Sequence, residues 1–312
     1  MAGIVVRYCR FGGKAAPAFS ALPPSMAVAC FALAGGLGLA ACRGLLPDAA
    51  APVSPVPVRF LITFDDGPSG AARNNSTALI LDTLARNRWQ NDIKAIFFVQ
   101  TRHRTGGGTG IGQQLMQRMH RDGHLLALHT ASMRGHVNHT QMPLAELDRN
   151  LGDGIEDIRR LSGAAARFIR PPFWHFNPAT LARYEMHGLS MLLDDISIRD
   201  GKVWGITSNP NARKRIRADL HKVARRIRDG ELPALSGYFP LVMTMHDTNP
   251  TTARNLESYL DMLVEEARHV GLLVHPQPFI TPGEELMRVA NLRVNRSLLA
   301  RAEMARPTVA VE

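Results

Sequence analysis

Short apolar runs alternate with stretches of helical periodicity along most of this chain. Each run is bounded by turn residues or charges, which is typical of a β-strand. The runs are Arg59–Phe64, Lys94–Val99, His124–Leu128, Arg167–Ile169, Leu189–Leu193, Leu241–Met245 and Leu272–Val274. Between them, the apolar spacing predicts amphipathic helices that begin near Ser76, Ile111, Pro143, Pro178, Ala212 and Thr251. Regular alternation of strand and helix favours a parallel sheet or a (β/α) barrel.

The N-terminal region has a different pattern. Arg7, Arg10 and Lys14 precede an uncharged apolar stretch, Met26–Ala41, which predicts an export signal. This stretch is too short for a membrane-spanning helix, which needs about 20 strongly apolar residues. The chain is therefore expected to divide into a signal peptide, a Pro/Ala-rich tether, a folded domain and a helical tail. Their boundaries are 1–41, 42–57, 58–282 and 283–312.

The end of the apolar stretch, Leu39-Ala40-Ala41-Cys42, resembles the lipobox of bacterial lipoproteins. The resemblance implies lipidation of Cys42 and a protein anchored in the cell envelope. Arg43 stands where an aspartate would signal retention at the inner membrane, so the outer membrane, facing the periplasm, is favoured. The alternative is an ordinary signal or membrane anchor in which Cys42 has no role.

Composition supports a folded body. Of the 312 residues, 45% are hydrophobic and 21% are charged, which excludes a disordered chain. The formal net charge of +10 favours anionic surroundings, and the densest positive run is a predicted helix from Arg213 through Arg228. Its apolar residues form a stripe, so the charges are expected on a solvated face. Because the protein is expected outside the cytoplasm, nucleic acid is not an expected partner.

Ionisable residues follow four of the predicted strands. They lie in Asp65-Asp66-Gly67-Pro68, His129-Thr130, Arg170-Pro171-Pro172-Phe173 and His246-Asp247. Catalytic groups of parallel α/β folds gather at the carboxyl ends of strands, so these side chains are expected at one rim. When two adjacent carboxylates point in different directions, one can bind a metal while the other accepts a proton from water. Two histidines and one carboxylate make a catalytic zinc-type site, with bonds of about 2.0–2.2 Å.

These residues resemble the polysaccharide deacetylases of the carbohydrate esterase type, which share the NodB homology domain. The likeness covers about residues 58–282 in matching order. It implies an α/β fold, a distorted (β/α) barrel of the NodB type. It also implies that Asp65 is the general base, that Arg170 holds this base, and that Asp66 and His129 bind the metal.

The second histidine ligand is displaced from its usual place in the family. It normally lies four residues after the first, where this chain has Met133, and a thioether is a poor ligand for such a site. Alignment from the downstream helix indicates a three-residue insertion and favours His136, with His139 as the alternative. Zinc is the expected metal, and cobalt or another divalent ion is also compatible with these ligands.

The remaining roles follow from the same resemblance. His246 would protonate the leaving amine, and the backbone N–H of Phe173 would bind the oxyanion, which is worth about 3–4 kcal/mol per donor in well-studied hydrolases. Asp200 is the best match for the carboxylate that tunes His246. The tryptophan that usually follows it is Gly201 here, and Trp204 is a candidate to fill the space.

The sequence therefore predicts a metal-dependent hydrolase that removes N-acetyl or O-acetyl groups from an envelope or extracellular polysaccharide. An N-acetylglucosamine polymer, cut at a carbon–nitrogen bond other than a peptide bond, is the expected substrate. One alternative is a catalytically impaired glycan-binding lipoprotein, suggested by Met133 and Gly201. The other is an amidohydrolase of small molecules on the same fold.

Overall fold

A computed structural model describes residues 52–202, 208–281 and 283–294. The chain divides into two units, Met1–Ala49 and Ala50–Glu312, and all described residues belong to the second. The signal peptide, Cys42, the first part of the tether, Trp204 and residues 295–312 lie outside the described residues. Within the described part, no helix is both long enough and apolar enough to cross a membrane.

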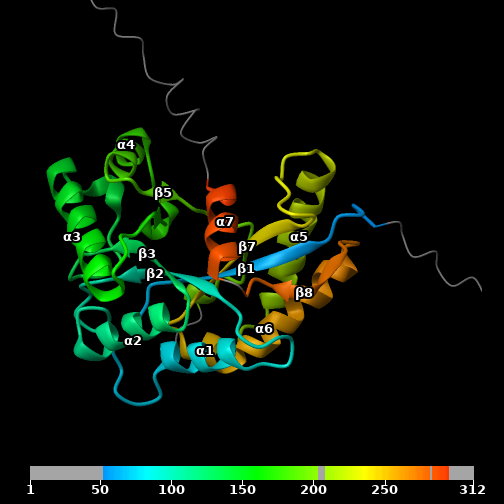
Figure 1. Ribbon diagram of the computed structural model, residues 1–312, viewed down its shortest axis with the longest axis horizontal. Helices are drawn as coiled ribbons and strands as arrows, with labels where there is room; N and C mark the ends of the chain where they lie inside the picture. Colours follow the sequence, from blue (N-terminus) through cyan, green and yellow to red (C-terminus); the bar gives the residue numbers. More distant parts are fainter. Residues whose placement is uncertain (1–51, 203–207, 282, 295–312) are drawn as a thin grey trace, which may run out of the picture. The chain divides into compact units, whose positions relative to one another are not determined.

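One parallel sheet forms the centre of the second unit (Figure 1). Its strands are β1 (Val58–Asp65), β2 (Ala95–Gln100), β3 (Leu125–Thr130), β4 (Phe168–Ile169), β5 (Ser190–Met191), β6 (Ile196–Ser197), β7 (Phe239–His246) and β8 (Val274–Phe279). Their order is β5-β4-β3-β2-β1-β7-β6, and β8 also pairs with β1. The sheet is a curled half-barrel between two free edges, which confirms the predicted distorted (β/α) barrel.

Helices connect the strands and cover the outer face of the sheet. They are α1 (Ser76–Ala85), α2 (Gly110–Arg121), α3 (Leu144–Ser162), α4 (Pro178–Met186), α5 (Ala212–Arg228) and α6 (Pro250–His269), with short 3-10 helices η1 (His139–Gln141), η2 (Pro172–Trp174) and η3 (Asp200–Lys202). Side-chain oxygens of Asn75, Thr109, Asn177 and Asn249 cap four helix N-termini. The six predicted helix starts agree with the observed first residues of α1–α6 within one residue.

The two faces of β1 have different roles because side chains alternate along a strand. Phe60, Ile62 and Phe64 are buried in the large apolar layer beneath the outer helices. Leu61 points to the inner face, where a second apolar cluster lies. Asp65 shares this inner face at the carboxyl end of β1, so the strand delivers a carboxylate to the inside of the curled sheet.

The last helix, α7 (Gly283–Arg293), fills part of the inner face and lies against β7 (Figure 1). Leu286 and Val289 are fully buried in the inner cluster. Glu285 accepts a hydrogen bond from Arg59 at 2.6 Å, and Arg293 donates to Asp195 at 2.7 Å. The described part of the predicted C-terminal tail is thus built into the domain.

The end of the predicted tether also contacts the domain. The backbone N–H of Val53 donates to the carbonyl of Gly271 at 2.9 Å, and that of Val58 donates to Leu273 at 2.7 Å. Residues 53–57 therefore lie along the folded body.

Candidate active site

The predicted site residues gather at one rim of the sheet. Strands β1 and β7 run in register, so Asp65 lies opposite His246. Strand β3 ends at Thr130, one residue after His129, and β4 ends one residue before Arg170. The strand ends thus bring four separate stretches of sequence together, as expected for a parallel sheet.

The two adjacent aspartates point in different directions. Asp65 ends β1, and its side chain is almost completely buried. Asp66 has a φ of +72°, in the left-handed region that a non-glycine residue adopts only at an energetic cost. This backbone turn directs Asp66 toward the histidines, where Gln100 Nε2 donates to its Oδ1 at 2.8 Å.

Arg170 fixes the position of Asp65 from beneath the site. Its Nη1 lies 2.7 Å from Asp65 Oδ1 and 2.8 Å from Thr63 Oγ1, and its Nε donates to the carbonyl of Leu192 at 3.0 Å. The guanidinium is fully buried, 4.1 Å from the centre of the Phe98 ring and 5.0 Å from that of Trp174. A buried cation held by this many contacts leaves the Asp65 carboxylate little freedom to rotate.

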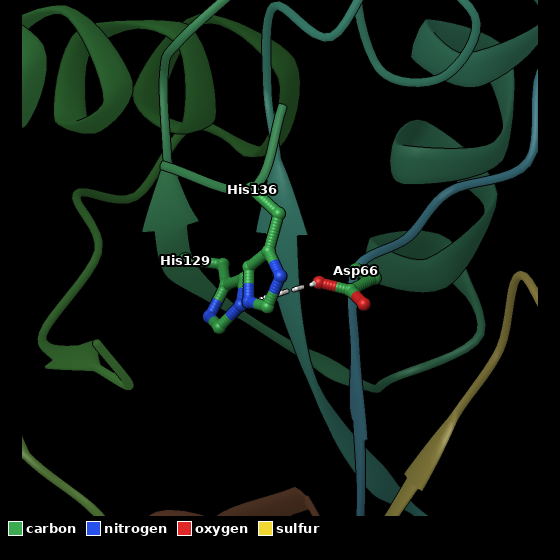
Figure 2. A group of neighbouring side chains, drawn as sticks. All are labelled: Asp66, His129 and His136. Carbon is green, nitrogen blue, oxygen red and sulfur yellow. Dashed lines mark ion pairs between the residues drawn. The ribbon is translucent and has the colours of Figure 1, made fainter. Parts of the chain in front are cut away.

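Asp66, His129 and His136 form a compact group of potential metal ligands (Figure 2). Their candidate ligand atoms all lie within 4.8 Å of one another. Nε2 of His129 lies 3.3 Å from Asp66 Oδ1, and Nε2 of His136 lies 3.7 Å from the same oxygen. Figure 2 shows the carboxylate facing the two stacked imidazoles, whose ring centres are 5.1 Å apart.

The hydrogen bonding of His129 indicates that this group suits a cation. Its Nδ1 lies 2.7 Å from the carbonyl oxygen of Arg170, which can only accept, so Nδ1 carries the proton in the neutral ring. The lone pair on Nε2 then faces Asp66, and this buried Nε2 has no hydrogen-bond partner in the described part of the chain. Two hydrogen-bond acceptors 3.3 Å apart repel each other unless a cation lies between them. A metal-binding histidine usually donates its other ring N–H to a group such as a backbone carbonyl, as His129 does here.

The charges around Asp66 favour its anionic form. Burial alone would raise the pKa of this carboxyl, but His129, His246 and His136 lower it below its usual range. Burial lowers the pKa of His136 to about 4, so this imidazole is neutral at pH 7. A carboxylate with two imidazoles is a donor set suited to a divalent metal.

The structure places His136 in this group and His139 outside it. His139 is completely buried in η1, and its Nδ1 lies 2.8 Å from the hydroxyl of Tyr184 on α4. Met133, at the usual position of the second histidine, has 56% of its surface exposed and does not enter the group. The loop after β3 therefore makes His136 the geometric equivalent of the missing histidine.

Phe173 lies directly beside His136. Its ring stacks on the imidazole with 4.0 Å between centres, and it remains 47% exposed. Its backbone N–H donates to His136 Nε2 at 3.1 Å, because a φ of +58° turns the peptide toward the site. The amide expected to bind an oxyanion therefore points at the same spot as the three candidate ligands.

His246 and Asp200 form a second pair across the site. Asp200, fully buried, accepts from His246 Nδ1 at 2.7 Å and from its backbone N–H at 2.8 Å. Thr252 Oγ1 also donates to this carboxylate, at 2.5 Å. Burial would lower the pKa of His246, but the charges of Asp200 and Asp66 raise it to about 10. Its Nε2 lies 3.8 Å from Asp66 Oδ2.

Gly201 lies against the ring of His246. A Cβ added at this position would come within 3.1 Å of His246 Cε1. Position 201, where tryptophan is usual in the family, is therefore in contact with the imidazole. Because glycine has no side chain, residue 201 does not cover this side of the ring.

Several residues around the site escaped the sequence analysis. They are Thr63, Gln100, His103, Arg134, Trp174 and Thr252. Gln100 ends β2, so the rule applied to the other strand ends could have found it. A hollow of about 390 Å³ opens beside Asp66 and His136, with Gln100, His103 and Arg134 in its wall.

Comparison with known sequences finds similarity to polysaccharide deacetylases. Residues 56–192 match the sequence model of the polysaccharide deacetylase family. The chitin deacetylase of Colletotrichum lindemuthianum is 30% identical over 112 residues, which are 36% of this chain and 40% of that protein. The peptidoglycan-N-acetylglucosamine deacetylase of Bacillus cereus is 32% identical over 112 residues, 36% of this chain and 35% of that protein. Each alignment spans less than half of the relative's length.

Solved structures share the fold. The structure of the same Colletotrichum chitin deacetylase superposes with a TM-score of 0.52 and 21% identity, over 72% of this chain and 85% of that one. A family 4 carbohydrate esterase from Streptomyces lividans superposes with a TM-score of 0.50 and 20% identity, over 73% of this chain and 99% of that one. At this level of identity the likeness concerns the fold.

Proposed function

We propose that this chain is a polysaccharide deacetylase of the NodB type, a metal-dependent hydrolase that removes N-acetyl groups from an envelope or extracellular polysaccharide. The observation that carries the proposal is the Asp66–His129–His136 group, with Asp65 and His246 on its rim. A binding protein would have no need of a buried base and a paired histidine around potential metal ligands.

The metal would be held by Asp66, His129 and His136. When bound, a divalent ion supplies Lewis acidity toward the acetyl carbonyl and the attacking water. Zinc suits one carboxylate and two imidazoles, and cobalt accepts the same ligands. Gln100 would orient the Asp66 carboxylate through the hydrogen bond to Oδ1.

The protein's own side chains would move the protons. Asp65, held by Arg170, would accept a proton from the attacking water. His246 would donate a proton from Nε2 to the departing sugar amine, because Asp200 occupies its Nδ1 and keeps the ring oriented. A pKa of about 10 keeps this imidazole protonated at neutral pH in the free protein.

Phe173 would serve the substrate in two ways. Its backbone N–H is available to a developing oxyanion once His136 turns its lone pair to a metal. Its exposed ring offers a flat apolar surface for the face of a sugar.

The reaction can be tested with N-acetylglucosamine oligomers and the purified chain. We expect acetate and a free sugar amine to appear in equal amounts, and a chelator to stop both until zinc or cobalt is restored. Acetate without amine, from an O-acetylated glycan only, would identify an esterase. Tight oligomer binding with no acetate at any metal loading would contradict the proposal and favour the glycan-binding alternative.

We also propose that the protein is exported and anchored to the outer membrane by a lipid on Cys42, because this cysteine ends a lipobox-like sequence. Cys42→Ser should prevent lipid attachment. In bacteria that express the chain, fractionation after labelling with a fatty acid should show label and membrane association for the wild type only. Equal membrane association of both forms, without label, would contradict the lipid anchor.

A further inference from the structure

The hollow beside the metal-ligand group contains a cation that the proposed reaction does not use. Asp66, Gln100 and His136 line one side of this hollow, and His103 and Arg134 contribute to its wall. Among the residues that the structure describes, Arg134 is the only arginine or lysine in the lining. A substrate that places its acetyl group at the metal-ligand group and also fills this hollow would lie beside this side chain.

The loop that carries Arg134 is held firmly in place. Gly135 has a φ of +79°, and a Cβ there would come within 2.8 Å of both Gln100 Oε1 and the His103 ring. Because no side chain fits at this position, the loop packs with its backbone directly on the wall of the hollow. The N–H of Arg104 also donates to the carbonyl of Met133, at 3.3 Å. Arg134 therefore emerges from a fixed backbone two residues before His136.

The guanidinium of Arg134 has no acidic partner among the residues that the structure describes. Two other arginines near the site are neutralised: Arg170 pairs with Asp65, and Arg102 pairs with Asp153 and Asp157. An exposed arginine without a partner is ordinary on an open surface, but this one lines a substrate-sized hollow. Asp66 also lines that hollow, but its carboxylate already accepts a hydrogen bond from Gln100 and faces two histidines.

We infer that Arg134 recognises a carboxylate on the sugar next to the acetylated one, so that the substrate is an acidic N-acetylated glycan. The inference rests on the proposed function and specifies its substrate class. One guanidinium matches a single negative charge and can bind a carboxylate through two parallel hydrogen bonds. The imidazole of His103 lies in the same wall and offers a further donor. The net charge of +10 favours approach of such a polymer.

The test compares one N-acetylated oligosaccharide carrying a carboxylate with its neutral methyl ester, and measures kcat/KM for acetate release from each. The wild type should prefer the acid by about tenfold, the size of one charge-assisted contact, and this preference should fall with added salt. Arg134→Gln should bring the ratio near one, mainly through the KM of the acid, and Arg134→Glu should favour the ester. Arg86→Gln removes the same charge from an exposed residue at the far end of α1 and should keep the wild-type ratio.

The outcomes separate this inference from the proposed function. Equal wild-type rates on acid and ester would overturn the inference while leaving the deacetylase intact. A wild-type preference that survives in Arg134→Gln would overturn it as well. No acetate from either compound would instead refute the proposed function. Bound zinc, measured in each variant, checks that His136 is undisturbed, and Arg134→Gln should keep the wild-type amount.

Discussion

Replacing Asp65 by asparagine is expected to lower acetate release by about 10²- to 10⁴-fold while zinc remains bound, because a neutral amide cannot accept a proton from water. The substitution keeps the size of the side chain and leaves the three candidate ligands untouched. Its second effect is on stability. Asp65 is the ion-pair partner of the fully buried Arg170, and removing one partner of such a pair costs about 3–5 kcal/mol.

The assay therefore needs a measure of folding beside the rate. Thermal unfolding should show a lower midpoint for Asp65→Asn, and acetate release should be measured well below that midpoint. Asp153→Asn is a matched control, because Asp153 is a half-exposed carboxylate on α3 that pairs with Arg102 at the surface. It should keep full activity and lose no more than about 1 kcal/mol of stability. Activity within a few fold of wild type in folded, zinc-loaded Asp65→Asn would rule Asp65 out as the base.

Most of the fold could be predicted from the sequence because strands and helices alternate with clear periodicity. Six of the seven predicted strands are present, and so are the six helices, whereas the predicted strand Leu272–Val274 meets the observed β8 (Val274–Phe279) only at Val274. Strand β6 was not predicted, since its two residues, Ile196 and Ser197, form no apolar run. The position of α7 was not predicted either, because a helical period shows that Leu286 and Val289 share a face but not which surface they cover.

The rim of the site was predictable for a similar reason. Side chains that directly follow a strand have few places to go, so Asp65, Arg170 and His246 could be located from the strand ends. Loop residues are different, because spacing does not determine the path of a loop. The choice between His136 and His139 depends on how 131–138 folds back over Gln100. Arg134 carried no signal, since only the packing of Gly135 reveals that it lines the hollow.

Replacing His136 by alanine is expected to remove the bound metal and, with it, acetate release. Changes to residues that merely support a metal ligand cost about 10- to 100-fold in affinity, so loss of a ligand should cost more than 100-fold. The alanine would also free the amide of Phe173, which now donates to His136 Nε2. Two ligands, Asp66 and His129, would remain, too few for a stable catalytic site.

Replacing His139 by alanine provides the matched control. This histidine is three residues away, is completely buried and contacts Tyr184 rather than Asp66. Its loss leaves a cavity and an unpaired tyrosine hydroxyl, which should cost about 1–3 kcal/mol of stability. Metal binding and the rate of the folded protein should be unchanged.

The most direct test of the metal-dependent deacetylase is to measure bound zinc per chain and acetate release together, in stripped and reloaded wild type, His136→Ala and His139→Ala. The account predicts that acetate release by the wild type and by His139→Ala rises in proportion to bound zinc and saturates at one ion per chain. His136→Ala should fail to retain zinc and release no acetate. Release that is independent of bound zinc, or loss of zinc in His139→Ala but not in His136→Ala, would contradict it.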